Sequence, residues 1–552
     1  MTTVRGKLRN LLLDAVLRAQ QQGALPPVAV PEITIETPQN PEHGDYASNV
    51  ALRMARTARM DPMSIARVLA DQVASGDFLS SVEVARPGFL NFRLSPAWLA
   101  AQVETILAEA GDYGRVDLGK GARVQVEYVS ANPTGPLHVG AGRGAALGDS
   151  LANVLAHAGY QVEREYYVND AGARMEAFYA TLYARYLQQL GIQEELPADG
   201  YAGEYMVELA REIVDERGRE FLDMPRDEAL QKLGRLGTEK MLGRIRRDLD
   251  RMNVRFDRWF SEQSLYDSSQ ITKTIELLRQ RGYVAEREGA VWFASSALGE
   301  EKDNVLVRSN GSPTYFASDA AYHFDKFCVR GFDRVIDVWG ADHQGHVPRM
   351  KAMVAALGVD PSRLELIIYQ LVSLKRSGKP VRMSKRTGEI ITLGEVLDEV
   401  GPDAVRFFLL ARSADAMMDF DLDLAKEQSS ENPVYYVQYA HARIASILRY
   451  ASDVDFTDGD VSLLTSEPEL DLIRKMLALP ELVETAAATL SPHHLPHYSQ
   501  EIAAVFHSFY KQCRVVSEDQ SLTKARLKLV SACKIVLGNT LALMGVTAPE
   551  SM

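Results

Sequence analysis

The segment from residue 123 to residue 168 constrains the fold most, because a strand, a glycine-rich turn, a helix and a second strand follow one another there. Residues 123–130 alternate apolar and polar side chains, residues 142–159 carry leucines at helical spacing, and residues 162–168 form a second strand-like run. A strand–helix–strand unit makes its two strands parallel. The sequence therefore predicts an α/β fold with a Rossmann-type, doubly wound parallel sheet.

The 552 residues are enough for several domains, and their patterns divide the chain into three. Residues 1–112 mix helical periodicity with two short strand-like runs, which predicts an N-terminal α+β domain. Residues 113–400 contain the parallel sheet, interrupted at about 175–258 by a charge-rich helical insertion. Residues 401–552 read as almost entirely helical, so we expect an all-α C-terminal domain.

Composition excludes several classes of protein. The chain has 61 Lys and Arg against 74 Asp and Glu, a net charge of −13, and 46% hydrophobic residues, which excludes a disordered chain. Cys328, Cys513 and Cys533 are too far apart for a disulfide framework or a Cys-x-x-Cys zinc site, and they suit a reducing cytosol. No apolar run approaches the roughly 20 residues that span a bilayer, and Asp14 interrupts the basic N-terminus, which argues against a signal peptide. We therefore expect a cytoplasmic protein with no membrane association.

The first motif with chemical content is His138-Val-Gly-Ala-Gly-Arg-Gly144, between the first strand and its helix. A helix N-terminus presents free N–H groups and the positive end of a dipole, which suits a phosphate. Gly140 and Gly142 allow a ligand to approach the backbone, and His138 adds a side-chain donor. Glycine-rich turns are common, so the motif alone does not distinguish a phosphate site from a structural turn.

The second motif is Lys379-Pro-Val-Arg-Met-Ser-Lys-Arg-Thr-Gly388. Cations around Met383, Ser384 and Lys385 can meet a polyphosphate and offset the charge that develops on a leaving pyrophosphate. The alternative is a solvated basic loop. The basic residues in and before this motif are Lys375, Arg376, Lys379, Arg382, Lys385 and Arg386.

Together the two motifs resemble the nucleotide-binding motifs of class I aminoacyl-tRNA synthetases, in which a His-x-Gly motif comes early and a Met-Ser-Lys motif comes late. Further stretches narrow the resemblance to the arginyl-tRNA synthetase family, and it covers nearly the whole chain. These stretches are Val126-Glu-Tyr-Val-Ser-Ala-Asn-Pro-Thr-Gly-Pro-Leu-His138, Tyr167-Val-Asn-Asp-Ala-Gly172, Pro313-Thr-Tyr-Phe-Ala-Ser-Asp-Ala-Ala-Tyr-His323, Gly340-Ala-Asp-His-Gln344, Asp403-Ala-Val-Arg406 and Asn432-Pro-Val-Tyr-Tyr-Val-Gln-Tyr-Ala-His-Ala-Arg443.

The chain departs from the family pattern at both motifs. Ala141 stands where the family usually has a second histidine, and Arg143 is the nearest residue that could compensate for it. Arg382 and Arg386 replace the usual lysine and serine of the late motif, whereas Lys385 is kept. Ala141 leaves open a non-catalytic RNA-binding paralogue, and the fold leaves open another nucleotidyl transferase, such as a different class I synthetase.

The resemblance implies an arginine site, and the residue types suit it. A guanidinium needs carboxylates and further acceptors around its rim. Tyr315 and Asp319 are four positions apart, so one helical turn would place them on one face, and Glu127 ends the first strand. The alternative for each residue is a capping or surface role, and the sequence does not assign the two carboxylates between guanidinium and α-ammonium. The implied arginine-binding residues are Glu127, Asn132, Tyr315, Asp319 and Gln344.

The resemblance also implies a nucleotide site, with His138 and Lys385 as catalytic residues. His343 and His346 have a spacing that suits zinc, but no cysteine lies nearby, so we expect no resident metal and place this turn at the adenosine. Tyr167, Asn169 and Asp170 are expected to line the active site. The implied ATP-binding residues are His138, Gly140, Gly142, Asp342, His343, Met383, Ser384 and Lys385.

The C-terminal helical region resembles an anticodon-binding domain, and residues 1–112 resemble a second tRNA-binding domain. Aromatic side chains can stack splayed bases, although most aromatics here are expected to pack between helices. The basic run at residues 235–258 is a second RNA candidate, or simply a solvated helix face. The residues expected to bind tRNA are Asn49, Tyr435, Tyr439, Arg443 and Arg514.

The activity that the resemblance implies is ATP-dependent ligation of L-arginine to tRNA(Arg) through an arginyl-adenylate. Mg²⁺ is expected with ATP, and no covalent enzyme intermediate is expected. The resemblance also implies charging of the terminal 2′-hydroxyl and a need for bound tRNA before arginine is activated. Separately, we expect a monomeric enzyme.

Overall fold

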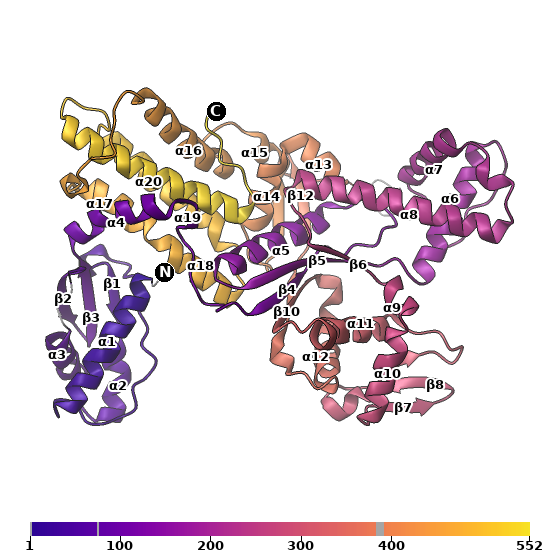
Figure 1. Cartoon of the computed structure of the whole chain (residues 1–552), viewed down its shortest axis with the longest axis horizontal. Coiled ribbons are helices and arrows are strands. Elements are labelled where there is room, and N and C mark those ends of the chain that lie inside the picture. Colours follow the sequence, from indigo (N-terminus) through magenta and orange to yellow (C-terminus); the bar gives the residue numbers. More distant parts are fainter. Residues whose placement is uncertain (1–2, 74–76, 382–390) are drawn as a thin grey trace.

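The computed structural model describes residues 3–73, 77–381 and 391–552. Its centre is a five-stranded parallel sheet with the order β11-β10-β4-β5-β6, which confirms the predicted α/β class. Strands β4, β5, β6 and β10 are labelled at the centre of Figure 1. The chain runs outward from β4 to β5 and β6 and then returns to the other side of β4, so the winding reverses between β4 and β10. Ligands of open α/β sheets bind at such a reversal, beyond the carboxyl ends of the strands. The strands are β4 (Arg123–Glu127), β5 (Gln161–Val168), β6 (Arg258–Ser261), β10 (Arg334–Gly340) and β11 (Leu364–Tyr369).

Helix α5 (Val139–His157) connects β4 to β5 and packs against β4, β5 and β10. Its close approach depends on glycine: a Cβ on Gly148 would lie 2.2 Å from Cγ of Tyr128, the residue that follows β4. Most of the helix is buried because the helical C-terminal domain covers its other face. The first turn of α5 is thereby held at the carboxyl edge of the sheet.

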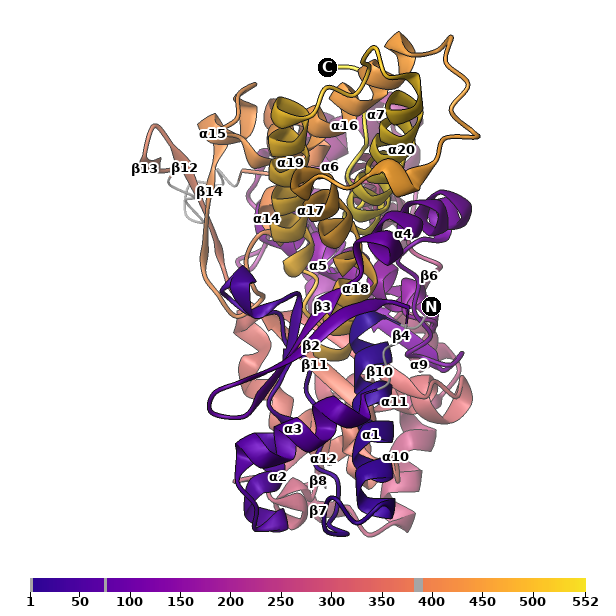
Figure 2. The same ribbon diagram turned by 90° about the vertical axis from the view of Figure 1, so that its left-hand side faces the viewer.

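The N-terminal domain is α+β, as predicted, and forms a separate lobe below the C-terminal helices (Figures 1 and 2). Its three-stranded antiparallel sheet has the order β1-β3-β2. β1 has only three residues, too few for an alternating pattern to be visible in the sequence, and its pairing with β3 forms the strand. The elements are α1 (Val4–Gln21), β1 (Tyr46–Ser48), α2 (Val50–Ala58), α3 (Pro62–Gln72), β2 (Leu79–Ala85) and β3 (Phe89–Leu94).

Between β5 and β6 the chain forms the predicted helical insertion, which projects from the sheet at the right of Figure 1. It consists of α6 (Ala173–Gln189), α7 (Glu204–Arg217) and α8 (Arg226–Arg251). A second excursion follows β6 and includes a small antiparallel sheet, β7-β8-β9, which the sequence analysis does not predict. Its elements are α9 (Gln263–Asp267), α10 (Gln270–Gln280), β7 (Val284–Arg287), β8 (Ala290–Phe293), β9 (Asn304–Val307) and α11 (Tyr315–Phe324), and α11 continues into a π-helical turn at Asp325–Val329.

The C-terminal domain is mainly helical, but not entirely so. β14 (Met418–Asp421) pairs in parallel with β12 (Val372–Arg376), and β12 also pairs with β13 (Lys379–Pro380), so the expectation of an all-α region from residue 401 is wrong at this strand. A four-residue strand whose partner is distant in sequence leaves no local pattern to detect. The helices are α13 (Leu393–Val400), α14 (Pro402–Leu410), α15 (Leu422–Lys426), α16 (Pro433–Tyr450), α17 (Glu467–Met476), α18 (Ala478–Thr489), α19 (His494–Gln512) and α20 (Gln520–Met544).

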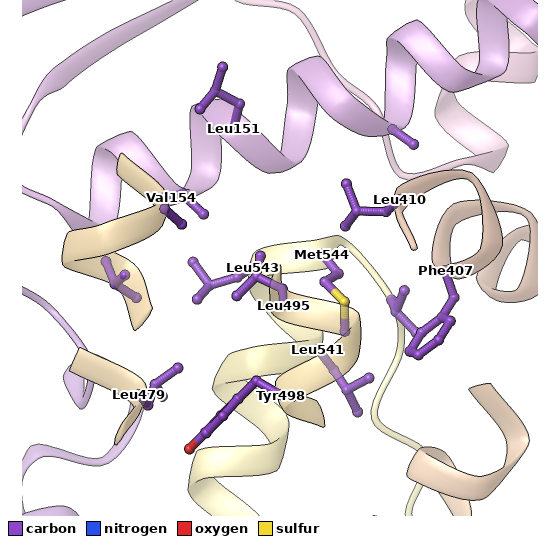
Figure 3. Close-up of a cluster of buried hydrophobic side chains, with 14 of the residues drawn as sticks. Leu151, Val154, Phe407, Leu410, Leu479, Leu495, Tyr498, Leu541, Leu543 and Met544 are labelled. Atoms are coloured by element: carbon purple, nitrogen blue, oxygen red, sulfur yellow. The ribbon is translucent and has the colours of Figure 1, made fainter. Parts of the chain in front are cut away.

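Apolar side chains join the C-terminal helices to α5, which packs on the parallel sheet. Figure 3 shows Leu151 of α5, Phe407 of α14 and Leu541 of α20 among the buried side chains of one cluster. Arg406 is buried beside it: its guanidinium lies 2.5 Å from the Asp149 carboxylate of α5 and donates to the Met544 carbonyl at 2.6 Å. The Asp403-Ala-Val-Arg406 stretch thus holds domains together. Helix α4 (Pro96–Glu109), which follows the N-terminal lobe, packs on α17 and α20.

Helix α20 is long and apolar enough to cross a membrane. In this structure 67% of its most apolar window is buried, as in the core helix of a globular domain. The feature is weak evidence for a membrane span, because buried core helices meet the same criteria of length and composition.

Candidate active site

The carboxyl end of β4 is a tightly held turn. Val129 and Ser130 both have positive φ, 68° and 41°, which non-glycine residues adopt rarely and mainly where surrounding contacts impose it. Those contacts are present: the Ser130 hydroxyl donates to Glu127 at 2.9 Å and accepts from the Tyr167 N–H at 3.1 Å. Asn169 donates to the Ser130 carbonyl at 2.9 Å. The Glu127 carboxylate is therefore fixed at the point where the winding of the sheet reverses.

A second carboxylate, Glu262, stands at the end of β6 and is only 2% exposed. Among the described residues, its Oε2 atom has no hydrogen-bond partner, and the buried hydroxyl of Tyr167 has none either. Burial raises the pKa of Glu262 to about 7, the carboxylates of Asp319 and Asp170 add to the rise, and a hydrogen bond from Ser318 opposes it. A buried carboxylate with one oxygen unpaired, near another carboxylate, is costly without a cation, so this arrangement suits a cationic ligand.

Asp319 and Tyr315 both lie on α11, which confirms the helical turn that their spacing predicts. Burial raises the pKa of Asp319, while the positive charges of His323, Arg349 and His343 oppose the rise. Asp319 also raises the pKa of Tyr167 and of Glu262, so these three groups lie near one another. We call Glu127, Tyr167, Glu262 and Asp319 the acidic pocket. Tyr315 is 49% exposed.

Glu262 is the one residue of the acidic pocket that is absent from the residues expected from the sequence. Its signal is a strand that ends in a carboxylate, Arg258-Trp-Phe-Ser-Glu262, but this strand is short and follows a long helical insertion. Asp170, which we expected to line the active site, accepts from the Ser261 hydroxyl at 2.6 Å and from the Gln263 N–H at 2.9 Å. Asp170 thereby joins the end of β5 to the end of β6 and helps to position Glu262.

The early glycine-rich motif begins at His138, the N-cap of α5, whose Nδ1 accepts from the Ala141 N–H at 3.3 Å. His138 forms a backbone bridge with Thr392, and the Leu393 N–H donates to the Leu137 carbonyl at 2.7 Å. The early motif therefore contacts the segment that directly follows the late one. Met383, Ser384 and Lys385, like Arg382 and Arg386, lie outside the described residues.

The glycines and Arg143 of the early motif have packing contacts here. A Cβ on Gly142 would lie 2.8 Å from Leu393, and one on Gly140 would lie 2.9 Å from the His138 ring. Arg143 is fully buried and donates to the Gln370 carbonyl at 2.7 Å and to the Ser413 carbonyl at 2.8 Å. Its guanidinium is committed to these carbonyls, so the hypothesis that Arg143 compensates for Ala141 is not supported.

Asp342, His343 and Gln344 lie on the 3-10 turn Ala341–His346, directly after β10. All three are exposed, and the His343 ring lies 5.9 Å from the Trp339 ring. Within the described ranges, no group of three or more His, Cys, Asp or Glu residues could hold a metal ion. Asn132 is half-buried in the loop after β4.

Three of the residues expected to bind tRNA line one cavity of about 800 Å³ between α16, α19 and the C-terminus, namely Tyr439, Arg443 and Arg514. Arg443 donates to the Tyr439 hydroxyl at 2.6 Å and lies 5.1 Å from the centre of the Tyr510 ring. Tyr435 stacks on Tyr439 at 6.2 Å, outside the lining of the cavity.

The other RNA candidates have internal contacts. Asn49 accepts from the Thr34 hydroxyl at 3.0 Å in the N-terminal lobe. In the basic run of α8, Arg244 pairs with Glu212 at 2.7 Å and Arg251 with Asp398 at 2.5 Å. These two arginines therefore fit the alternative of an ion-paired helix face better than an RNA-binding one.

Three family models match the chain: an arginyl-tRNA synthetase N-terminal domain over residues 6–94, a class I (R) tRNA synthetase catalytic domain over 102–445, and a DALR anticodon-binding domain over 437–552. An arginine–tRNA ligase of Dehalococcoides mccartyi (strain CBDB1) is 55% identical over 551 residues, and the match covers 99% of each chain. That of Carboxydothermus hydrogenoformans is 49% identical, covering 100% of this chain and 99% of the relative.

Solved structures agree with these matches. A structure from Campylobacter jejuni described as an arginyl-tRNA synthetase has a TM-score of 0.77 at 35% identity and covers 83% of this chain and 100% of its own. Arginyl-tRNA synthetase from Thermus thermophilus has a TM-score of 0.78 at 25% identity, with both chains covered completely. The chain therefore belongs to the arginyl-tRNA synthetase family, the class I arginine–tRNA ligases.

Proposed function

We propose that the acidic pocket is where this arginine–tRNA ligase holds its arginine, with the guanidinium between Glu262 and Asp319 and the α-ammonium at Glu127. The buried Glu262 carboxylate carries the proposal: its Oε2 atom has no described partner, and Asp319 adds to the rise of its pKa. Two neighbouring carboxylates match the planar donors of a guanidinium. Both Glu127 oxygens already accept hydrogen bonds, from Ser130 at 2.9 Å and from Lys326 at 2.6 Å. Glu127 therefore has less room for a fork of donors and suits a compact ammonium.

The remaining members of the proposed arginine site are Asn132, Tyr315 and Gln344. Their amide and hydroxyl groups would serve the guanidinium rim or the polar end of the amino acid. Tyr167 would offer its buried hydroxyl to the same ligand, because that hydroxyl has no described partner.

The chain attaches arginine to tRNA(Arg) and uses ATP as substrate. The proposed course has two steps. An arginine carboxylate oxygen attacks the α-phosphorus of ATP, which forms arginyl-adenylate and releases pyrophosphate. A terminal ribose hydroxyl of tRNA, the 2′-hydroxyl by family resemblance, then attacks the carbonyl carbon, and AMP leaves as the hydroxyl proton is lost. No covalent bond to the enzyme is needed, so the site acts by positioning and charge stabilisation.

For the nucleotide we propose the N-terminus of α5 with His138, Gly140 and Gly142 at the phosphates, and Asp342 and His343 at the adenosine. His138 contacts the segment after the late motif, which supports a joint role with Met383, Ser384 and Lys385. Lys385 would meet the charge on pyrophosphate as it leaves. Mg²⁺ would come with ATP, held mostly by phosphate oxygens and water, since the described residues offer no carboxylate and histidine cage for it.

For tRNA we propose that the cavity lined by Tyr439, Arg443 and Arg514 takes a splayed anticodon base. A stacking ring and a cation at the rim of a cavity of this size support this role. A tRNA-binding role for the N-terminal lobe and for Asn49 remains a prediction. The domain bounds also remain predictions: 1–112, 113–400 for the catalytic domain and 401–552 for the anticodon-binding domain. So do Tyr435 as a tRNA contact, the monomeric state and the cytoplasmic location.

The experiment is aminoacylation of total tRNA with arginine and, separately, with lysine. Lysine would leave guanidinium acceptors unpaired in a buried site, so it should be charged at least about a thousandfold less efficiently. Comparable charging of lysine, or of a neutral amino acid, would refute the assignment of the acidic pocket. Glu262→Gln and Asp319→Asn should each raise the KM for arginine and leave the KM for ATP unchanged.

A further inference from the structure

A fully buried lysine lies beneath the acidic pocket. Lys326 is 0% exposed, on the π-helical turn that ends α11. Its ammonium donates to Glu127 Oε2 at 2.6 Å and to Asp337 Oδ1 at 2.8 Å, and it lies 4.1 Å from the centre of the Tyr322 ring. Its hydrogen-bonding and cation–π contacts are therefore all made inside the protein, and none is left for solvent.

The contacts of Lys326 continue to the other side of the pocket. Glu127 and Asp337 are register partners on the adjacent strands β4 and β10. The second Asp337 oxygen lies 2.9 Å from His323 Nε2, and His323 Nδ1 lies 2.8 Å from the backbone carbonyl of Asp319. A continuous path thus joins Glu127 to the backbone of Asp319, the residues proposed to receive the two cationic ends of arginine.

Two buried carboxylates on neighbouring strands need a cation between them. Burial raises the pKa of Glu127, the positive charge of Lys326 opposes that rise, and Asp337 adds to it. The nearby Glu165 is already served by Arg330, Gln125 and the Tyr322 hydroxyl. Without Lys326 a proton would replace the missing positive charge, and a protonated Glu127 is a poor partner for an ammonium.

We propose that Lys326 is a positioning residue for arginine recognition: together with Asp337 and His323 it keeps Glu127 ionised and fixes it relative to Asp319. The proposal rests on the proposed function, because it takes Glu127 and Asp319 as the groups that receive the two ends of arginine. Lys326 touches neither substrate nor the reacting atoms. It acts through Glu127, so its loss should affect the binding of arginine and not the binding of ATP.

The test compares Lys326→Met with the double variant Lys326→Met/Asp337→Asn in steady-state aminoacylation, with melting temperatures measured in parallel. Lys326→Met should raise the KM for arginine about tenfold or more, with the KM for ATP within about twofold of the parent. The double variant removes one negative charge together with the positive one, which recovers part of the cost of ionising Glu127. Its KM for arginine should fall at least about threefold below that of Lys326→Met.

A purely structural role for Lys326 predicts a different pattern. The KM for arginine would then be unchanged in Lys326→Met, or would stay high in the double variant, and either result overturns the proposal. If Lys326→Met does not fold, a folded double variant with near-parental KM supports the proposal, and a double variant that also fails to fold overturns it.

Two further variants make the outcome specific. Lys351→Met removes another part-buried lysine, one that donates to the carbonyls of Pro361 and Leu364, and should lower stability without changing the KM for arginine. Glu127→Gln tests the proposed function itself and should raise the KM for arginine. If Glu127→Gln has no effect, the assignment of Glu127 fails whatever Lys326 does. If Glu127→Gln raises KM and Lys326→Met does not, only the role of Lys326 fails.

Discussion

Neutralising Glu262 should raise the free energy of unfolding of the free protein and weaken its binding of arginine. In the folded chain the pKa of Glu262 is raised from 4.5 to about 7 by burial and by the carboxylates of Asp319 and Asp170. That difference corresponds to about 3 kcal/mol of free energy of unfolding, lost when the side chain ionises inside the protein. The sign follows from the direction of the change: the cost is absent below pH 4.5, sets in as pH rises towards about 7, and is complete above that value.

The Glu262→Gln variant keeps the shape of the side chain and removes the charge. Its free energy of unfolding, measured by denaturant titration without arginine, should exceed that of the parent by up to about 3 kcal/mol at pH 8 and by little at pH 4.5. Its KM for arginine should rise about ten- to a hundredfold, the loss of one charged hydrogen-bonding partner of a buried cation.

The pH dependence of the KM for arginine provides a second measurement. If arginine binds the ionised pocket as proposed, the parent KM should rise as pH falls below about 7. One pH unit below that value it should be about tenfold above its high-pH value. In Glu262→Gln this dependence should flatten. Glu481→Gln is the matched control, since Glu481 is also buried with a raised pKa but contacts Arg5 and Tyr46 in the N-terminal lobe. A variant that loses stability at pH 8, or that keeps the parental KM, would refute the reasoning.

Three further predictions concern the other parts of the site. Lys385→Ala should lower kcat about a hundredfold with little change in arginine affinity, because the Lys385 cation acts on charge that develops during the reaction. Steady-state and single-turnover kinetics measure this, and near-normal turnover would favour the alternative of a solvated basic loop. Exchange of pyrophosphate into ATP with arginine should be negligible until tRNA is added, and full exchange without tRNA would contradict this expectation from family resemblance. Tyr439→Ala should weaken tRNA binding, measured as Kd by titration, by about 1–3 kcal/mol of stacking energy, whereas Tyr450→Ala, at the same cavity but 81% exposed, should change it less.

The parts of the fold that carry their own local pattern could be predicted from the sequence. The strand–turn–helix–strand unit around α5 is apolar on a regular period, and the insertion between β5 and β6 is long, charged and helical. The strands β1, β6 and β14 have three or four residues and are defined by distant partners, so no local period distinguishes them. The β7-β8-β9 sheet is equally short in each strand.

The residues of the candidate site also differ in how far the sequence predicts them. Glu127, Tyr315 and Asp319 lie in long stretches that resemble the family, and the structure brings two of them to the acidic pocket. Glu262 follows a four-residue strand, and Lys326 lies in a π-helical turn, where ordinary helical spacing does not tell which way a side chain points. Arg143 is the opposite case. Its charge suggests that it could compensate for Ala141 at a phosphate, whereas its burial and its bond to the Gln370 carbonyl indicate a structural role.

The charges around the pocket explain why arginine, and not merely a cation, would complete it. Asp337 and Glu127 share Lys326, and Glu165 is bound by Arg330, so the protein supplies positive partners for the carboxylates on β4, β5 and β10. No described side chain donates to Glu262 Oε2, and the pKa values of Glu262 and Asp319 are both raised by burial. The negative charge is thus least compensated at Glu262 and Asp319, where a guanidinium would bind. At Glu127, where an ammonium would bind, Lys326 already compensates it. Lysine could satisfy one carboxylate but not the pair. The cost of leaving Glu262 Oε2 without a donor in the free protein would therefore become selectivity once arginine is bound.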